Sequence, residues 1–255
     1  MVRYDSLEGK VAICTGGGSG MAKAASLKFA ENGVKVAVVD IDAPAAEETV
    51  SLIKEAGETA ISIKADMERA EDIKAMVKQT IDAFGRLDYA FNSVGVGGVP
   101  DGQGGAMGIS DEAWLKMMNI DLNSVWLCMN KEVPEMLKTG GGAIVNTSSM
   151  AGTRGHRSAA YAAAKHGIIG LTKSAAVILG PQNIRINAIC PGYTRTKMWL
   201  RGYSSAEEQE RLRQTVPIRR IGTPEDVANL VLFLCSDEGS YITGTAVPID
   251  GGLSA

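Results

Sequence analysis

Tyr161 and Lys165 are the two residues of this chain whose types and spacing most directly suggest chemistry, in the segment Tyr161-Ala-Ala-Ala-Lys165. On a helix, residues four apart lie on one face, one turn from each other. A phenol has an ordinary pKa of about 10, too high for proton exchange near neutral pH, and a neighbouring ammonium favours the ionised form. The pair is therefore a candidate general acid/base. This spacing also arises by chance in many helices. Whether the pair is catalytic therefore depends on the elements that surround it.

A glycine-rich segment, Thr15-Gly-Gly-Gly-Ser-Gly-Met-Ala22, lies between an apolar strand expected at 10–15 and an alanine-rich helix expected to end near 32. Glycines let a turn close tightly and let backbone N–H groups approach a pyrophosphate, and the helix N-terminus adds a partial positive charge. The strand–turn–helix order is the context in which such a turn binds a dinucleotide. The segment therefore predicts a dinucleotide site.

Asp40 ends the next expected strand, 20 residues after Gly20. An acidic residue at this place binds the ribose 2′-hydroxyl of NAD. Asp40 and Asp42 would repel a 2′-phosphate, and Ile41 offers no guanidinium to receive one. NAD is therefore favoured over NADP, the alternative being that Asp40 is an ordinary residue at a strand end.

The rest of the chain alternates strands and helices. Strands are expected at 10–15, 34–40, 59–65, 87–91, 143–148, 183–190 and 246–249, and helices near 20–32, 44–56, 70–84, 111–137, 159–179 and 226–235. Nearly continuous apolar strands that alternate with helices indicate a parallel sheet covered on both faces. We expect one α/β domain over 1–255, since no linker or change of composition divides the chain.

Two irregular segments follow strand ends, where ligands bind in open α/β sheets. Residues 95–108 contain seven glycines and are expected to form a mobile loop, or simply a surface turn. Residues 194–220 are expected to form a lid over the active site, or an ordinary amphipathic helix. Met198, Trp199 and Tyr203 in this segment suggest an apolar wall for the substrate.

Composition limits the classes of partner. The chain has 26 basic and 29 acidic residues, which argues against nucleic-acid binding and against binding to a membrane surface. It contains no apolar run long enough for a bilayer span and no secretory leader at its start, so we expect a cytoplasmic protein. The four cysteines are far apart in apolar segments and are expected to be buried thiols. His156 and His166 have no cluster of ligating residues around them, so no metal site is expected.

With these parts in order, the chain resembles the short-chain dehydrogenase/reductase family across essentially its whole length. The matching segments are Thr15-Gly16-x-x-x-Gly20-x-Ala22, Asp66 after the third strand, Asn92-Ser93-Val94-Gly95 (two substitutions from Asn-Asn-Ala-Gly), Ser148-Ser149-Met-Ala-Gly152, Tyr161-x-x-x-Lys165, Pro191-Gly192 with Thr194 and Thr196, and Asp250-Gly251-Gly252. They occur in the order that the family has.

The resemblance implies a Rossmann fold, a doubly wound parallel sheet of about seven strands with helices on both faces. It also implies an NAD site formed by Gly16, Ser19, Gly20, Met21, Asp40, Ile41, Asp66, Met67, Asn92, Gly95, Tyr161, Lys165, Pro191, Thr194 and Thr196. Family members are usually homotetramers and sometimes dimers, so a homotetramer is expected.

The same resemblance implies a mechanism in which hydride passes between the nicotinamide and a substrate carbon. Tyr161 would exchange a proton with the substrate oxygen, and Lys165 would hold the nicotinamide ribose and favour the phenolate. A serine would donate a hydrogen bond to the substrate oxygen. Gly152 fixes the register on Ser149, with Ser148 the neighbouring alternative, because the loop to Tyr161 is one residue short.

Asp121 is a departure from the family, which usually has an asparagine there that anchors a water leading protons to the lysine. Asn119 and Asn123 are two residues away and would point to nearly the opposite helix face. We expect Asp121 to keep the relay but to stabilise the ammonium, raising the pH at which oxidation becomes efficient. The alternative is that only the backbone carbonyl at this position matters.

The sequence thus predicts an NAD-dependent oxidoreductase acting on a small secondary alcohol or ketone. An NADPH-linked carbonyl reductase is one alternative, and a catalytically silent nucleotide sensor on the same fold is another. Arg154, His156 and Arg157 follow the catalytic serine and could favour an anionic substrate group, or could belong to a solvated loop.

Overall fold

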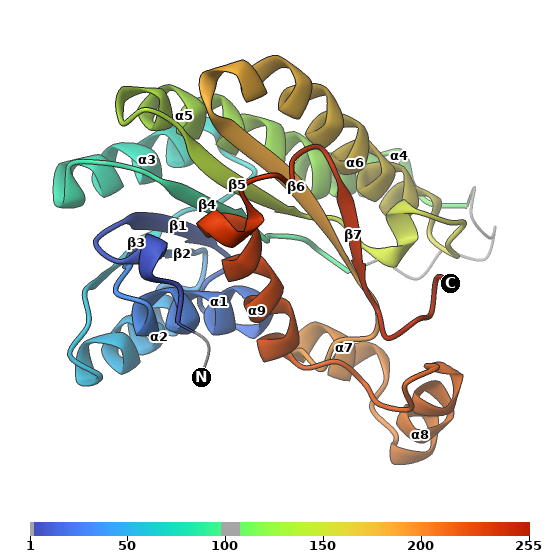
Figure 1. Ribbon diagram of the computed structural model, residues 1–255. Coiled ribbons are helices and arrows are strands. Elements are labelled where there is room, and N and C mark those ends of the chain that lie inside the picture. Colours follow the sequence, from blue (N-terminus) through green and yellow to red (C-terminus); the bar gives the residue numbers. More distant parts are fainter. Residues whose placement is uncertain (1–2, 98–107) are drawn as a thin grey trace.

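Seven parallel strands form one sheet in the computed structural model, which describes residues 3–97 and 108–255 (Figure 1). The strands are β1 (Val11–Thr15), β2 (Lys35–Asp40), β3 (Ala60–Lys64), β4 (Tyr89–Asn92), β5 (Gly142–Thr147), β6 (Ile184–Pro191) and β7 (Ala246–Ile249). They are hydrogen-bonded in the order β3-β2-β1-β4-β5-β6-β7. The chain therefore winds outward from β1 in one direction, returns to the centre and winds outward in the other, which confirms the predicted doubly wound sheet.

Helices cover both faces of this sheet (Figure 1). They are α1 (Gly20–Glu31), α2 (Ala43–Glu55), α3 (Ala70–Phe84), α4 (Asp111–Met118), α5 (Ser124–Lys138), α6 (Ala159–Leu179), α7 (Lys197–Gly202), α8 (Ala206–Thr215) and α9 (Pro224–Cys235). Helices α1, α2 and α9 bury their apolar residues on one face, and α3, α5 and α6 on the other. Strand side chains alternate between the faces, so Ala12 and Cys14 of β1 join the first core and Val11 and Ile13 join the second.

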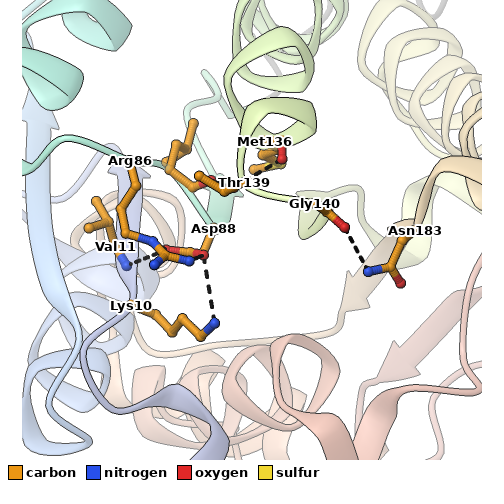
Figure 2. Close-up of polar contacts among 9 residues, drawn as sticks. Lys10, Val11, Arg86, Asp88, Met136, Thr139, Gly140 and Asn183 are labelled. Carbon is orange, nitrogen blue, oxygen red and sulfur yellow. Dashed lines mark hydrogen bonds and ion pairs between the residues drawn. The ribbon is translucent and has the colours of Figure 1, made fainter.

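Asp88 ties β1 to β4 at the amino-terminal edge of the sheet (Figure 2). Its Oδ2 accepts a hydrogen bond from the Val11 N–H at 2.9 Å, and its two oxygens accept from the Arg86 guanidinium at 2.8 and 2.5 Å. Lys10 Nζ lies 4.0 Å from Asp88 Oδ1. These contacts hold the central strands together at this edge, while the loops at the opposite, carboxyl edge carry the residues singled out above.

The long helix expected at 111–137 is interrupted, and this is a correction. Helix α4 ends at Met118, residues Asn119–Asn123 form a π-helical turn, and α5 begins at Ser124. A π turn inserts extra backbone into a helix and is frequent at functional sites. Here the wider turn carries Asp121, whose side chain is buried.

Residues 194–220 contain two short helices, α7 and α8, of which α8 projects from the body of the molecule (Figure 1). Hydroxyl side chains begin both helices: Thr196 accepts a hydrogen bond from the Trp199 N–H, and Ser205 from the Glu208 N–H. The other irregular segment, expected to be a mobile loop over 95–108, lies outside the described residues from 98 to 107.

All four cysteines are free and buried, as the sequence predicts. Burial raises the pKa of Cys14 and that of Cys235 to about 12, so both thiols stay protonated at neutral pH. None of the described helices is long and apolar enough to cross a membrane.

Candidate active site

Tyr161 and Lys165 lie on helix α6, one turn apart, at the carboxyl edge of the sheet. The Lys165 Nζ atom is 5.4 Å from the centroid of the Tyr161 ring. Lys165 is buried and its ammonium donates a hydrogen bond to the Thr147 carbonyl at 3.3 Å, while Tyr161 is half-buried. An ammonium held above a phenol inside the protein is placed to stabilise a phenolate.

Asp121 forms an ion pair with the same ammonium. Its Oδ1 lies 3.0 Å from Lys165 Nζ, and its Oδ2 accepts a hydrogen bond from the Val96 N–H at 3.1 Å. Burial raises the pKa of Asp121, an effect that Lys165 and Val96 oppose without cancelling it. Burial alone would lower the pKa of Lys165, but the attraction of Asp121 and Tyr161 outweighs it and raises that pKa, so Lys165 stays an ammonium.

Asn119 and Asn123 stay away from this pair. Both are exposed, and the Asn123 side chain donates a hydrogen bond to Asn119 Oδ1 at 2.9 Å. Neither asparagine is therefore placed to take over the position of Asp121.

Ser148 and Ser149 follow β5 but have different surroundings. The Ser148 hydroxyl is buried and donates to the Lys165 carbonyl at 2.8 Å. Ser149 is half-buried, and its oxygen accepts from the Ala151 N–H at 3.1 Å, which leaves its proton available to another acceptor. Of the two serines, Ser149 is the one with a free donor.

The glycine-rich turn after β1 is closely packed around its backbone. A Cβ on Gly17 would lie 2.7 Å from Val38 Cγ1, and one on Gly18 would lie 2.8 Å from the Ala45 methyl. Gly16 and Gly20 have positive φ angles of 76° and 56°. Ser19 directly precedes α1 and its side chain makes no capping bond, and Met21 lies in the first turn. The N–H groups of Gly17 and Gly18 donate to the Val39 carbonyl and the Asp40 carboxylate. The N-terminus of α1, which directly follows, is the kind of position that binds phosphate.

Asp40 ends β2 beside that turn. Its Oδ2 accepts a hydrogen bond from the Gly18 N–H at 2.9 Å, and its Oδ1 accepts from the Asp42 N–H at 3.0 Å. Each carboxylate oxygen can accept a further bond, so two ribose hydroxyls would find acceptors here. The turn and Asp40 together fit a dinucleotide.

A hollow of about 370 Å³ lies farther along the same edge. It is lined by Ile41, Lys64, Asp66, Arg69, Asp72 and Ala75. Asp66 Oδ1 accepts from the Glu68 N–H at 2.9 Å, and the next residue, Met67, is buried. Arg69 is 3.5 Å from Asp72 in an ion pair. The hollow therefore brings Ile41 and Asp66 together, next to two cations that the sequence argument left out.

The loops after β4 and β6 complete the ring of residues. A Cβ on Gly95 would lie 2.6 Å from Asp121 Oδ1 and 3.3 Å from Lys165 Nζ, so Gly95 lies directly on the ion pair. Asn92, at the end of β4, is buried, as is Pro191 at the end of β6.

The segment that begins at Thr194 crosses both glycine loops. The methyl group of Thr196 would be 3.3 Å from a Cβ on Gly20, and Met198 Sδ would be 3.1 Å from a Cβ on Gly97. Thr194 itself is buried and pairs with Gly222. The start of the expected lid thus lies across the place where a dinucleotide would lie.

The mouth of the site is aromatic and basic. The His156 ring is 5.5 Å from the Tyr161 ring, and Tyr203 lies 5.5 Å from Trp199 and 6.1 Å from Tyr193. Arg154 donates a hydrogen bond to the Leu253 carbonyl at 3.0 Å, which ties it to the C-terminal segment. His156 therefore lies beside the ring of Tyr161.

Sequence reasoning missed three polar groups at this edge. The Thr15 hydroxyl accepts a hydrogen bond from the Ser93 N–H at 3.0 Å, and the Thr147 carbonyl accepts from Lys165. Glu132 is fully buried on α5. Thr15 lies in a segment that the sequence singled out, but its hydroxyl was given no role. Glu132 had a signal of its own, because it occupies an apolar-face position in the series Val125, Cys128, Met129 and Met136. Among the described residues, no group of three or more His, Cys, Asp or Glu side chains could hold a metal ion.

Comparisons with known proteins agree with this geometry. Residues 16–254 match the family model described as Enoyl-(Acyl carrier protein) reductase. The chain is 40% identical to the cyclohexanol dehydrogenase of Acinetobacter sp. (strain SE19) over 255 residues, which cover 100% of this chain and 98% of that protein.

Solved structures agree as well. The crystal structure of levodione reductase matches with a TM-score of 0.90 and 35% identity, covering 97% of this chain and 98% of that one. A 7α-hydroxysteroid dehydrogenase complexed with NADH and 7-oxo glycochenodeoxycholic acid matches with a TM-score of 0.92 and 32% identity, covering 99% and 98%. With its Rossmann sheet, its glycine-rich turn and these relatives, the chain belongs to the short-chain dehydrogenase/reductase family of oxidoreductases, which bind a nicotinamide cofactor.

Proposed function

We propose that this chain is an NAD-dependent oxidoreductase that interconverts a secondary alcohol and a ketone, with Tyr161 as the general acid/base. The observation that carries the proposal is the Lys165 ammonium, buried 5.4 Å from the Tyr161 ring at the edge where the glycine-rich turn and Asp40 lie. Cyclohexanol is the first substrate to try, because a relative at 40% identity is a cyclohexanol dehydrogenase.

NAD would supply the hydride acceptor in the oxidation, and NADH the hydride donor in the reduction. The turn from Gly16 to Met21 would hold the pyrophosphate, Asp40 the adenosine ribose, and Ile41, Asp66 and Met67 the adenine side. Asn92, Gly95, Pro191, Thr194 and Thr196 would line the nicotinamide side. The structure of the 7α-hydroxysteroid dehydrogenase that matches this chain contains NADH, which supports NAD as the cofactor here.

Tyr161 takes up the hydroxyl proton of the alcohol during oxidation and returns it to the ketone oxygen during reduction. Ser149, which has a free hydroxyl proton, donates to that same oxygen as charge develops on it. Lys165 supports the phenolate of Tyr161 and binds the nicotinamide ribose. Asp121 sets how strongly the ammonium acts, because it shares the charge at 3.0 Å.

Residues 194–220 are proposed to be a lid of the single domain 1–255. The positions of Thr196 beside Gly20 and of Met198 beside Gly97 support this, because a segment at the edge of the glycine-rich turn can cover a bound ligand. We further propose a homotetramer, and a cytoplasmic location, where the four free thiols would stay reduced.

The test is to mix the protein with NAD and secondary alcohols, beginning with cyclohexanol, and to follow the absorbance band of the reduced cofactor. Tyr161→Phe should lower kcat by about 10²-fold or more, because a positioned acid/base contributes 10²–10⁴-fold. Tyr241→Phe, which alters a fully exposed tyrosine, is the matched control and should turn over like the wild type.

Three other outcomes point elsewhere. Turnover that survives Tyr161→Phe would refute the mechanism. Faster turnover with NADP than with NAD would favour the NADPH-linked carbonyl reductase, which Lys64 and Arg69 beside Ile41 could serve by binding a 2′-phosphate. Binding of NAD without turnover of any alcohol or ketone would favour a nucleotide sensor.

A further inference from the structure

Glu132 is a carboxyl group in the apolar interior, outside the set of residues used above. Its side chain is 0% exposed on the face of α5 that packs against the sheet. Glu132 Oε2 accepts a hydrogen bond from Asn92 Nδ2 at 3.1 Å. An ionised carboxylate buried without a cation is costly, so its protonation state needs an explanation.

The Asn92 amide links Glu132 to a chain of polar side chains. Asn92 Nδ2 also donates to Asn146 Oδ1 at 3.2 Å, and Asn146 Nδ2 donates to the Thr172 hydroxyl at 3.1 Å. Asn92 and Asn146 are paired residues of β4 and β5. The chain therefore runs from α5 through the two strands to α6, the helix that carries Tyr161 and Lys165.

Two acceptors in this chain are left over. The two N–H bonds of Asn92 Nδ2 are used by Glu132 and Asn146, yet Asn92 Oδ1 and Glu132 Oε1 are both buried without a hydrogen-bond partner. A carboxylate only accepts, whereas a carboxylic acid has one O–H donor. One proton on Glu132 Oε1, donated to Asn92 Oδ1, would satisfy both atoms and close a ring of two hydrogen bonds.

Within the described parts of the chain, no charged group contributes to the pKa of Glu132. Strands β4 and β5 and helix α6 present Asn92, Asn146 and Thr172, and the buried residues of α3, which packs on α5, are not ionisable. The titratable neighbour is the Cys128 thiol, one turn earlier on α5, whose pKa lies well above its ordinary value because of burial and of Glu132. Burial raises the pKa of Glu132 to about 7, with the Asn92 N–H opposing the rise.

We propose that Glu132 is held as a neutral carboxylic acid, joined to the Asn92 side chain by two hydrogen bonds, and that this pair positions the end of β4. The second half of this proposal rests on the function proposed above. From Asn92 the chain continues to Ser93, whose N–H donates to Thr15, and to Gly95, which lies on the Asp121–Lys165 pair. Glu132 is therefore a positioning residue for the cofactor loop.

Glu132→Gln is the decisive variant, because an amide N–H replaces the acid O–H and keeps both hydrogen bonds with Asn92. Glu132→Met is the matched control, since it fills the same space without a hydrogen bond. If Glu132 only filled space, Met would serve at least as well as Gln. The proposal expects Gln to keep the wild-type KM for NAD and kcat, and Met to raise the KM for NAD severalfold with a smaller change in kcat.

Two measurements need no turnover. The infrared difference spectrum of wild type minus Glu132→Gln at pH 6 should contain a carboxylic acid C=O band that is lost at pH 8. A carboxylate band at both pH values would overturn the protonated acid.

Thermal or urea unfolding gives the second measurement. A folded-state pKa of about 7, above the ordinary value of 4.5, means that the folded protein holds a proton that the unfolded chain releases between these pH values. Wild-type stability, measured relative to Glu132→Gln, should therefore be highest below about pH 4.5 and fall as the pH rises to about 7, with the ratio of unfolding constants changing by up to roughly tenfold per pH unit. A pH-independent ratio would contradict the proposal.

The outcomes separate the two halves of the proposal. If the infrared and unfolding results hold while Glu132→Met leaves the KM for NAD unchanged, the positioning role is wrong. If no substrate turns over at all, the proposed function fails and the acid–amide pair stands.

Discussion

Asp121 is the main difference between this site and the usual pattern of its family, which has an asparagine at that position. A buried aspartate 3.0 Å from the Lys165 ammonium neutralises part of the charge that favours a Tyr161 phenolate. The same carboxylate orients the ammonium and accepts from Val96, so it also holds the loop after β4 in place. Asp121 therefore weakens the electrostatic support of the Tyr161 phenolate while it positions the Lys165 ammonium and the loop after β4.

Asp121→Asn should move the acid limb of the pH profile for alcohol oxidation to lower pH, by on the order of one pH unit. The reason is that a neutral amide still accepts a hydrogen bond but no longer offsets the positive charge of Lys165, so the phenolate forms more readily. The measurement is kcat/KM for oxidation against pH in the two proteins. Superimposable profiles would mean that only the backbone at this position matters.

The register of Gly152 favoured Ser149 in the sequence but left Ser148 as an alternative. Both follow the same strand, and the distinction depends on the Lys165 carbonyl, which the fold brings to Ser148 from 17 residues away. Asp40 and Lys165 were easier, because their places follow from strand and helix periodicity. Glu132 had a visible anomaly in its helix pattern, but its partner Asn92 is 40 residues away and is brought to it only by the sheet.

Elements with strong periodicity were predicted closely. The expected helices at 70–84 and 159–179 and the strand at 246–249 have the bounds seen in α3, α6 and β7. The interruption between α4 and α5 was missed because Asn-Ile-Asp-Leu-Asn contains no proline or glycine to mark it. Its cause is tertiary: the turn places the Asp121 carboxylate against Val96 and Lys165.

The lid proposal makes a prediction for the segment that contains α7 and α8. Arg195, Lys197 and Arg201 are trypsin sites near its start, and saturating NAD should slow cleavage there, because closure removes the open form from the protease. At 100 times the Kd the protection can reach about 100-fold. Limited proteolysis with mass spectrometry measures it, with cleavage at Lys138, at the far end of α5, as the internal control. Equal rates with and without NAD at both places would refute a ligand-dependent lid.

In the molecule as a whole, exposed apolar side chains gather on the helix layer that contains α5 and α6. Trp126 of α5 is 51% exposed, and Val177 and Ile178 near the end of α6 are 80% and 65% exposed. Both helices cover the same face of the sheet (Figure 1). Apolar groups left in water on neighbouring helices are typical of a surface that another protein copy covers.

Sedimentation analysis should therefore find a tetramer for the wild type and a smaller species for the double variant Trp126→Glu with Val177→Glu. Charges placed in a dimerising surface lose their hydration when the surface is covered, and that cost opposes assembly. Leu52→Glu on α2, the opposite layer, is the control and should leave the mass unchanged. A wild type that sediments as a monomer would rule out the assembly.

The packing of α9 against α1 sets the order in which the molecule can be completed during synthesis. Helix α1 follows the first strand, yet its buried residues, among them Ala25 and Phe29, share a core with Val227, Val231 and Leu232 of α9 (Figure 1). Domains fold as units as the chain emerges, N-terminal part first. Here the apolar face of α1 stays uncovered until α9, more than 200 residues farther along the chain, has left the ribosome. The half of the molecule that contains the glycine-rich turn is thus completed by one of the last segments to be synthesised. A nascent chain that stops before α9 exposes an apolar surface, which chaperones or proteases can bind.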